Sequence, residues 1–207
     1  MDISAVDVRF GDRRAGVLFP LPVVSTRIMK LIDDLRRHEP ADALEVRHVA
    51  ETLDLLTRSA RPFARDQFDP GHVTASCFIV DEQRATLLLH HHQRLDRWLQ
   101  MGGHVEGEES TAEAALREGA EESGLRDLRL VIDAIFDVDV HSIPAGRGEP
   151  AHRHFDVRYL ARTSTPFSIA IARTESNDLA WLPLDLAEAL MGEEASLRVI
   201  RKIRSCP

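Results

Sequence analysis

Three glutamates within one predicted helical turn carry the clearest chemical signal in the sequence. Glu118, Glu121 and Glu122 stand at positions i, i+3 and i+4, so their carboxylates project from one face of a helix. Like charges this close repel one another unless a cation neutralises them. Carboxylate oxygens suit Mg²⁺ or Mn²⁺, with waters and a substrate phosphate completing the octahedron. The cluster therefore predicts a divalent-metal site of the kind that assists cleavage of a diphosphate linkage.

The residues around this cluster predict where its helix begins and ends. Ser110 as N-cap and Glu113 three residues later form a capping-box pair, which places the first turn near Thr111. Gly124 suits the left-handed residue that follows a last turn. A glycine-containing loop at 102–107 comes before the helix. We expect a loop followed by a capped helix to position the carboxylates.

The segment Gly103–Leu125 resembles the Nudix box, G-x5-E-x7-R-E-U-x-E-E-x-G-U, where U is a bulky aliphatic residue. The matching positions are Gly103, Glu109, Arg117, Glu118, Glu121, Glu122, Gly124 and Leu125. Beyond the box, WLQMGGHVEG at 98–107 and EPAHRHFDVRYL at 149–160 are similar to a bacterial Nudix subgroup with a helical N-terminal extension. This resemblance covers about 70–185. A full set of fixed positions at the required spacing makes it specific.

The resemblance implies a cofactor, an activity and residue roles. Four residues would bind the metal ion, the first through its backbone carbonyl: Gly102, Glu118, Glu121 and Glu122. Arg117 would pair with Glu109 to hold the loop against the helix. The implied cofactor is Mg²⁺, with Mn²⁺ as an alternative. The implied activity is hydrolysis of the diphosphate linkage of a nucleoside diphosphate joined to another group, for example an ADP-ribose-like compound or a nucleoside triphosphate.

Gly119 is the one departure inside the box, because the family has a bulky aliphatic residue there. A glycine in mid-helix costs about 1 kcal/mol relative to alanine. It also fills no core volume on the inward stripe that it shares with Ala112 and Leu116. We expect the box helix to be held less firmly than in the family, with an effect on metal geometry rather than on metal identity.

Polar side chains alternate along the predicted strand at 152–161. His152, His154, Asp156 and Arg158 take one face and apolar residues take the other. If the polar face lines a cleft, these side chains contact substrate or metal; a solvated sheet face is the alternative. We select His152, His154 and Asp156 as candidate substrate-binding residues.

Other residues outside the box carry weaker signals. Glu149, in a loop rich in glycine and proline, is a candidate general base, with a solvated loop charge as the alternative. Arg94, after the run His90–His92, is a candidate substrate-binding residue, although three adjacent histidines cannot share one strand face. Trp98 could stack on a nucleobase, but core packing is favoured. Cys77 is interpreted as a small buried apolar residue.

The elements that must position these residues differ between the two ends of the chain. Helical spacing over 23–60, for example at Val24, Ile28 and Leu31, is broken at Pro40. The stretch 61–71 lacks periodicity. Strand patterns follow at 73–80, 86–91, 128–141, 152–161 and 179–182, and helical patterns at 186–190 and 195–204. We predict a helical N-terminal extension at 1–66 and a Nudix hydrolase domain at 67–207.

The fold class that follows is α+β, a Nudix-type α/β/α sandwich with a mixed sheet, preceded by the helical extension. Along 128–141 we expect Phe136, Val138 and Val140 on one strand face. The extension could serve as a homodimer contact, a lid or a partner site.

Composition limits the class of protein. The chain has 207 residues, 43% hydrophobic and 29% charged, which is typical of a globular protein. No apolar run approaches the roughly 20 residues of a membrane span. Its two cysteines, Cys77 and Cys206, have no zinc-ligand spacing. The net charge of −8 argues against broad capture of polymeric nucleic acid. We expect a cytoplasmic protein that acts on a small nucleotide-type substrate.

Three other functions are compatible with the same fold to different degrees. A non-catalytic nucleotide sensor or regulator is the main alternative, which Gly119 and the N-terminal helices favour and the intact carboxylates oppose. An isomerase of this fold would need an active-site cysteine, and Cys77 has no such context. An mRNA-decapping role would need a basic RNA track, which the net charge does not support.

Overall fold

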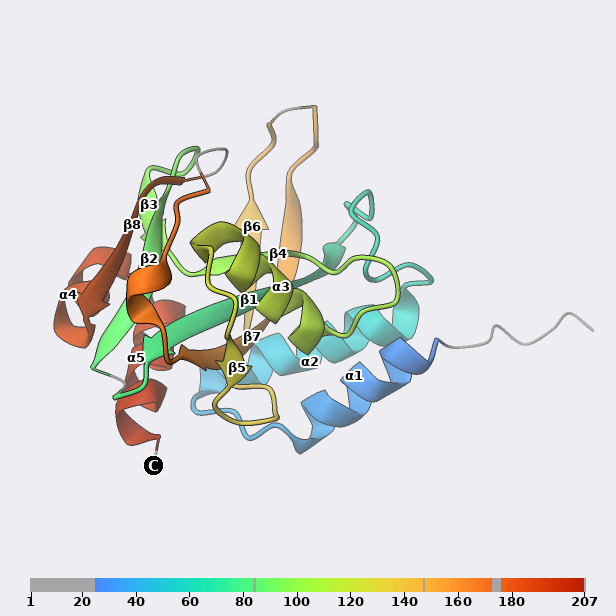
Figure 1. Cartoon of the computed structure of the whole chain (residues 1–207). Coiled ribbons are helices and arrows are strands. Elements are labelled where there is room, and N and C mark those ends of the chain that lie inside the picture. Colours follow the sequence, from blue (N-terminus) through green and yellow to red (C-terminus); the bar gives the residue numbers. More distant parts are fainter. Residues whose placement is uncertain (1–24, 84, 147, 173–175, 207) are drawn as a thin grey trace, which may run out of the picture.

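A mixed sheet with helices on both faces forms the centre of the molecule in the computed structural model (Figure 1). The structure describes residues 25–83, 85–146, 148–172 and 176–206. The strands are β1 (Gly71–Asp81), β2 (Thr86–His92), β3 (Arg97–Leu99), β4 (Met101–His104), β5 (Arg129–Leu130), β6 (Asp137–Ile143), β7 (His152–Thr163) and β8 (Ser176–Pro183). The helices are α1 (Thr26–Arg37), α2 (Ala43–Arg58), α3 (Thr111–Ser123), α4 (Leu184–Met191) and α5 (Glu194–Ser205), with a 3₁₀ turn η1 (Pro166–Ser168).

Strands β1 and β7 run side by side at the centre of the sheet and are the parallel pair. Their register extends from Gly71 opposite Arg153 to Asp81 opposite Thr163. The other strand pairs are antiparallel: β2 and β4 pair with β1, β5 and β6 pair with β7, and β3 and β8 pair with β2. The α+β fold with a mixed sheet, predicted from the sequence, is confirmed.

The alternation of side chains along β1 divides the core into two parts. Val73, Ala75 and Cys77 face a core that also contains residues of α1, α2 and α3. Phe78 and Val80 face the opposite core, which contains residues of α4 and α5. Each face of the sheet is therefore covered by helices, because successive side chains of a strand point to opposite sides.

The box helix has the predicted ends. The Ser110 hydroxyl accepts a hydrogen bond from the Glu113 amide at 3.2 Å, and the Glu113 carboxylate accepts one from the Ser110 amide at 2.8 Å. Gly124 follows the last turn with φ of 76°, in the left-handed region. The capped helix Thr111–Ser123 therefore forms as its own sequence dictates.

The strand predicted at 128–141 is wrong in its middle. The Val131 amide donates to the Leu160 carbonyl and the Phe136 amide donates to the Arg158 carbonyl, so the chain leaves β7 and returns to it. Residues 131–134 form a bend, and β6 begins only at Asp137. As a result Phe136 enters the core beside α5, whereas Val138 enters the opposite core. Val138 and Val140 keep the common face that was expected, and only Phe136 leaves it, because the detour before β6 changes the alternation.

The two N-terminal helices pack against the sheet. Val24 lies outside the described residues, but Ile28, Leu31 and Leu35 of α1 and Leu55 of α2 belong to the same core cluster as the inner residues of β1. Figure 1 shows α1 and α2 lying next to each other below the sheet. The boundary at residue 67 stays a prediction. Within the described residues, no helix combines the length and the apolar character needed to cross a membrane.

A buried carboxylate, Glu45, fastens α2 to the edge of the sheet and to the C-terminal helix. Its oxygens accept hydrogen bonds from Lys202 Nζ at 2.6 and 2.7 Å, from His38 Nε2 at 2.7 Å and from the Val138 amide at 3.2 Å. Burial by itself would raise the pKa of Glu45, but the bonds from His38 and Lys202 outweigh it and hold the pKa well below its ordinary value. Helix α2 is thus held to the rest of the protein by charged contacts as well as by apolar contacts.

Replacing this carboxylate should destabilise the protein strongly. We expect Glu45→Gln to lower the free energy of unfolding in urea by about 3 kcal/mol at pH 7, because Lys202 would lose its buried partner. The deficit should shrink as pH falls below the ordinary glutamate pKa of 4.5. A carboxylate with a lowered pKa stabilises the native state fully above its ordinary pKa, and this contribution is lost progressively as pH falls toward the lowered value. Asp54→Asn, which removes an exposed pair with Arg58, is the control. An equal loss of unfolding free energy in the two variants would contradict the stabilising role given to Glu45.

Candidate active site

One cleft of about 600 Å³ brings together nearly all of the residues selected from the sequence. Those that line it are Arg94, Gly102, Arg117, Glu118, Glu121, Glu122, Glu149, His152, His154 and Asp156. Glu109 does not line the cleft but contacts it through Arg117. The box loop and helix therefore meet the polar stripe of β7, which is about fifty residues away in the sequence, around a single hollow.

Arg117 connects the box loop to the box helix. Its Nη2 and Nε atoms donate to the two carboxylate oxygens of Glu109 at 2.8 and 3.2 Å, and Nη2 also donates to the His104 carbonyl at 2.8 Å. Its Nη1 donates to Glu118 at 2.9 Å and to Glu121 at 3.3 Å. Hydrogen bonding to Glu109 raises the pKa of Arg117, so the guanidinium stays charged. A planar fork matches this carboxylate geometry in a way that an ammonium group does not.

The loop expected at 102–107 begins as a strand, because Gly102 and Gly103 belong to β4 and pair with β1. These two glycines allow the chain to approach the carboxylates closely. A Cβ atom on Gly103 would lie within van der Waals overlap of the Glu118 carboxylate, and one on Gly102 would collide with Ser76 of β1. The Gly102 amide donates to Glu122 Oε2 at 3.0 Å. Glu118 and Glu122 are thus placed against the backbone of β4, where no residue larger than glycine fits without rearrangement.

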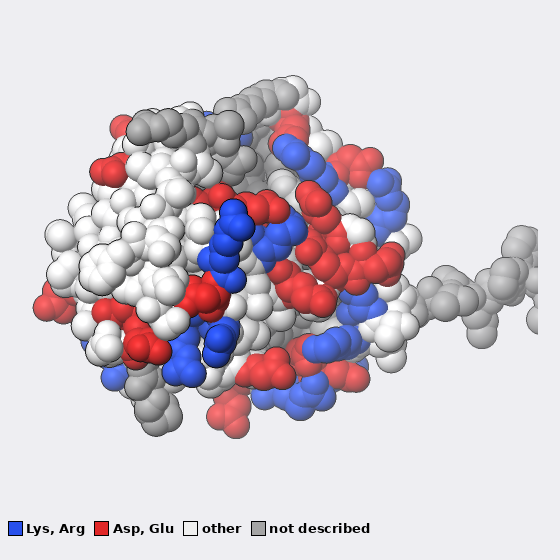
Figure 2. Space-filling model, viewed as in Figure 1, with Lys and Arg blue, Asp and Glu red and all other residues white. Residues whose placement is uncertain are grey.

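The charge balance of this cluster suits a divalent cation. Three carboxylates, those of Glu109, Glu118 and Glu121, pair with the guanidinium of Arg117. A fourth, that of Glu122, accepts a hydrogen bond from the Gly102 amide. Figure 2 shows acidic side chains gathered over α3 and the loop that precedes it, with basic side chains among them. One guanidinium does not balance four carboxylates, and oxygen donors are the ligands that Mg²⁺ and Mn²⁺ prefer. The residues present therefore fit a hard divalent ion.

The polar stripe of β7 divides at Asp156. His152 and His154 line the cleft, whereas Arg158 is buried and forms ion pairs with Asp139 at 2.8 Å and Asp137 at 3.4 Å. Asp156 lies between these two environments. Its oxygens accept hydrogen bonds from Thr74 at 3.1 Å, Ser76 at 2.7 Å and Arg158 at 3.0 Å. Its contact with substrate stays a prediction, and its bonds show that it also organises the cleft floor.

The run His90–His92 is split between the two sides of its strand. His90 and His92 line the cleft, and the His90 Nδ1 atom lies 2.6 Å from the Ser176 hydroxyl. His91 instead contacts the ring of Trp98, with 5.4 Å between centroids. Trp98 packs against the core that contains α4 and α5 and does not line this cleft. Arg94 lies at the rim, in the turn between β2 and β3.

Several residues in the cleft were missed by sequence reasoning. Thr74 and Ser76 lie on its floor, and His104, His141 and Phe63 line it as well. A signal for the first two was present, because H-x-T-x-S at 72–76 alternates polar residues along a strand that is otherwise apolar. Phe63 had no comparable signal, since it lies in the aperiodic stretch before β1.

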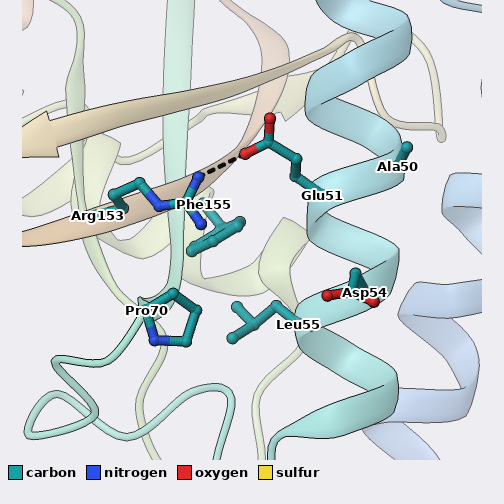
Figure 3. A pocket seen from close by; sticks show the side chains of 7 residues that line it. All are labelled: Ala50, Glu51, Asp54, Leu55, Pro70, Arg153 and Phe155. Carbon is teal, nitrogen blue, oxygen red and sulfur yellow. Dashed lines mark hydrogen bonds and ion pairs between the residues drawn. The ribbon is translucent and has the colours of Figure 1, made fainter.

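A second, smaller cavity of about 280 Å³ lies between α2 and the start of β7. Figure 3 shows its lining, with Arg153 and Glu51 joined by an ion pair next to Phe155. The lining residues are Ala50, Glu51, Asp54, Leu55, Pro70, Arg153 and Phe155. None of the residues selected from the sequence lies here, so the large cleft is the candidate active site.

Comparison with known proteins now assigns the family. The sequence model of the NUDIX domain matches residues 70–203, which is more than half of the chain. The chain belongs to the Nudix family. It is 28% identical over 137 residues to a probable DHNTP pyrophosphohydrolase of Lactococcus lactis subsp. cremoris (strain MG1363), covering 65% of this chain and 76% of that protein. It is therefore a Nudix hydrolase, of a family that acts on pyrophosphate bonds and generally uses divalent metal ions.

A solved structure of another hydrolase supports the fold. The C. elegans Ap4A hydrolase in a binary complex superposes with a TM-score of 0.53 at 20% identity, covering 64% of this chain and 95% of that chain. The matched share is consistent with the Nudix domain model, which begins at residue 70. Helices α1 and α2 lie ahead of the matched region.

The glycine that departs from the Nudix box is accounted for by its neighbours. A Cβ atom on Gly119 would lie 3.1 Å from Leu128 Cδ1 and 3.3 Å from Cys77 Cβ. Those side chains already occupy the space that the family's bulky aliphatic residue would need. Gly119 therefore leaves no gap for a bulky side chain, and the expectation that the box helix is held less firmly stays a prediction. Cys77 is fully buried, which raises its thiol pKa to about 12 and agrees with a packing role.

A bulky residue at Gly119 should therefore harm this Nudix hydrolase, although it would restore the family pattern. We expect Gly119→Leu to lower the free energy of unfolding by about 1–3 kcal/mol through overpacking. Adding Leu128→Ala should recover part of the loss by opening space beside residue 119. Urea denaturation of the wild type and both variants measures this. A Gly119→Leu variant as stable as the wild type would show that the space is available.

Loss of the Arg117 guanidinium should weaken binding of the divalent ion. We expect Arg117→Lys to reduce the apparent affinity for the activating divalent ion by at least about 10-fold, because the partners that orient metal ligands have effects of this size. Arg126→Lys, at an exposed arginine just after the box, is the matched control. Activity measured against metal concentration reports the change, and an unaltered metal dependence in Arg117→Lys would refute it.

Proposed function

We propose that this Nudix hydrolase uses Mg²⁺ to cleave the diphosphate linkage of a nucleoside diphosphate joined to another group, such as an ADP-ribose-like compound or a nucleoside triphosphate. The observation that carries the proposal is the cleft itself. Its carboxylate cluster lies in one hollow with histidines, Arg65, Arg94 and Phe63. A volume of about 600 Å³ is within the range of sites that bind ligands of nucleotide size.

The residues proposed to hold the ion are the Gly102 carbonyl with Glu118, Glu121 and Glu122. This is an all-oxygen donor set, which favours Mg²⁺, with Mn²⁺ as the alternative. When bound, the ion offsets charge on the diphosphate and acidifies an attacking water. The contact of Glu122 with the Gly102 amide supports this arrangement, because it brings the carboxylate to the same strand, β4, that would supply the carbonyl ligand.

Glu149 is the proposed general base. It lines the cleft and forms an ion pair with Arg65 at 3.5 Å. Its charge also acts on His72 and His104, so Glu149 lies near the histidines of β1, β4 and β7, which we call the histidine end of the cleft. The proposed role is to accept the proton of the attacking water. Arg117 and Glu109 would act by holding the loop and helix in place.

The other polar side chains of the cleft are the proposed substrate contacts. His152, His154 and Asp156 offer donors and acceptors from β7, and Arg94 offers a positive charge at the rim. The relatives suggest two further substrates for testing, since one carries the name DHNTP pyrophosphohydrolase and another the name Ap4A hydrolase. A cytoplasmic location and a homodimer remain part of the proposal.

A nucleotide sensor without turnover is the competing function. One argument for it was Gly119, and that argument is weakened because Cys77 and Leu128 occupy the space beside this glycine. The complete carboxylate cluster, with its supporting contacts from Arg117 and Gly102, favours catalysis.

A substrate panel with a matched pair of variants tests the proposed function. The purified protein is assayed with Mg²⁺ on ADP-ribose, nucleoside triphosphates, DHNTP and Ap4A, with product identification. We expect Glu122→Gln to reduce kcat by at least about 100-fold, since replacing a metal ligand should cost no less than replacing its outer partners. Glu108→Gln, an exposed glutamate at a variable position of the same loop, should retain activity.

Removal of metal by EDTA should abolish turnover, and Mg²⁺ should restore it. Equal turnover by wild type and Glu122→Gln would eliminate the proposed mechanism. Tight nucleotide binding with no turnover on the whole panel would favour the sensor.

A further inference from the structure

Three histidines from two neighbouring strands converge at the cleft, apart from the carboxylates of the Nudix box. His72 of β1 lies directly opposite His154 of β7 in the parallel register, and His152 precedes His154 by two residues on the same strand face. One ring nitrogen from each histidine lies within 4.8 Å of the other two. His72 and His152 are buried, whereas His154 is partly exposed.

Backbone carbonyls set the tautomer of two of these rings. His72 Nδ1 lies 3.1 Å from the Gln67 carbonyl, and His152 Nδ1 lies 2.9 Å from the Pro150 carbonyl. A carbonyl only accepts, so both Nδ1 atoms carry the proton and both Nε2 atoms present a lone pair. Histidine ligands of metals commonly have this arrangement, with the second nitrogen held by a carbonyl.

One of these lone pairs is buried without a partner. Among the described residues, His72 Nε2 has no hydrogen-bonding group within reach, although it is shielded from solvent. His152 Nε2 lies 3.3 Å from His154 Nε2. Buried polar atoms are nearly always satisfied, and an orphaned acceptor indicates an ion or water that completes the site.

We propose that His72, His152 and His154 bind a divalent transition-metal ion, Zn²⁺ in the first place, at a site separate from the carboxylate cluster. Imidazole nitrogen suits Zn²⁺, whereas Mg²⁺ prefers oxygen, so the two sites select different ions. Three protein ligands leave a fourth coordination position open. Because His152 and His154 line the cleft, that position faces the space available to the substrate.

The spacing of the ring nitrogens is close to what zinc requires. Zn–N bonds of about 2.0–2.1 Å in a tetrahedron place ligand nitrogens about 3.3 Å apart. His152 and His154 already have this separation, at 3.3 Å. The rest of the trio lies within 4.8 Å, so side-chain adjustments of about 1 Å would close the site.

Burial lowers the pKa of His72 and of His154, which favours their neutral rings, the form that binds metal. The His104 ring lies 5.0 Å from His72, and the His141 ring lies 5.6 Å from His154. Burial and the neighbouring histidines lower the pKa of His154 to about 2. Glu149 is near enough to act on His72, and its carboxylate provides a counter-charge for a bound cation.

Metal binding tests the proposal without any assay of activity. The full-length protein is stripped with EDTA, dialysed and titrated with Co²⁺, which replaces Zn²⁺ and absorbs visible light strongly in a four-coordinate site. We expect one equivalent of Co²⁺ to produce this absorption and Zn²⁺ to abolish it by displacement. X-ray absorption of the Zn²⁺-loaded wild type should show three imidazole ligands, and this measurement needs no variant.

Matched variants then assign the site. His152→Gln/His154→Gln should lose the Co²⁺ absorption and at least about 100-fold in Zn²⁺ affinity. His91→Gln, at a histidine outside the cleft, should keep both. Glu118→Gln/Glu122→Gln should also keep both, although that variant removes the proposed Mg²⁺ ligands. Circular dichroism of each variant verifies folding. If the histidine variant does not fold, X-ray absorption of the wild type still shows whether three imidazoles bind the ion.

Three outcomes would overturn the inference. They are no four-coordinate Co²⁺ signal in the wild type, a signal that survives in a folded His152→Gln/His154→Gln variant, and a signal lost in the glutamate variant. Because the readout is metal binding, failure of the Mg²⁺-dependent activity would leave this result unaffected.

Discussion

The parallel pairing of β1 with β7 is the constraint on which both the fold and the cleft depend. It joins strands about eighty residues apart along their whole length, from Gly71 opposite Arg153 to Asp81 opposite Thr163. One face of the pair is apolar and carries α3, with Gly119 in close contact with Cys77. The other face is apolar at one end and polar at the other. A slip of one residue would exchange these faces, because side chains alternate.

A chain of buried charges connects the cleft to the helices at both ends of the sequence. Asp156 on the cleft floor binds Arg158, which pairs with Asp137, and Asp137 in turn pairs with Arg198 of α5 at 2.7 Å. Lys202 of α5 contacts both Asp137 and Glu45 of α2. Buried ion pairs contribute little net stability, but losing one partner leaves an uncompensated charge. The N-terminal helices are thereby linked to the position of Asp156, and their removal would disturb the cleft floor.

The cleft combines two kinds of metal donor within one hollow. The carboxylates of the box and the Gly102 carbonyl offer hard oxygen atoms, while His152 and His154, with His72 beside them, offer borderline nitrogen atoms. Assays that add only Mg²⁺ and assays that add Mn²⁺ or Zn²⁺ would therefore load this cleft differently. Glu149 lies at the histidine end, so its proposed action as a base would depend on what occupies the neighbouring imidazoles.

The sequence by itself determined the box helix, its caps and the grouping of its three carboxylates, because capping and i, i+4 spacing involve neighbours within a few residues. It also indicated the family and ten of the residues that line the cleft. Only the tertiary structure decided that Arg158 is buried, that Phe136 enters the core opposite Val138, and that Gly119 faces Cys77 and Leu128. It alone brought His72 beside His154. The physical reason is that strand register and helix packing bring together residues that are far apart in the chain. Local sequence patterns do not predict which of these residues come into contact.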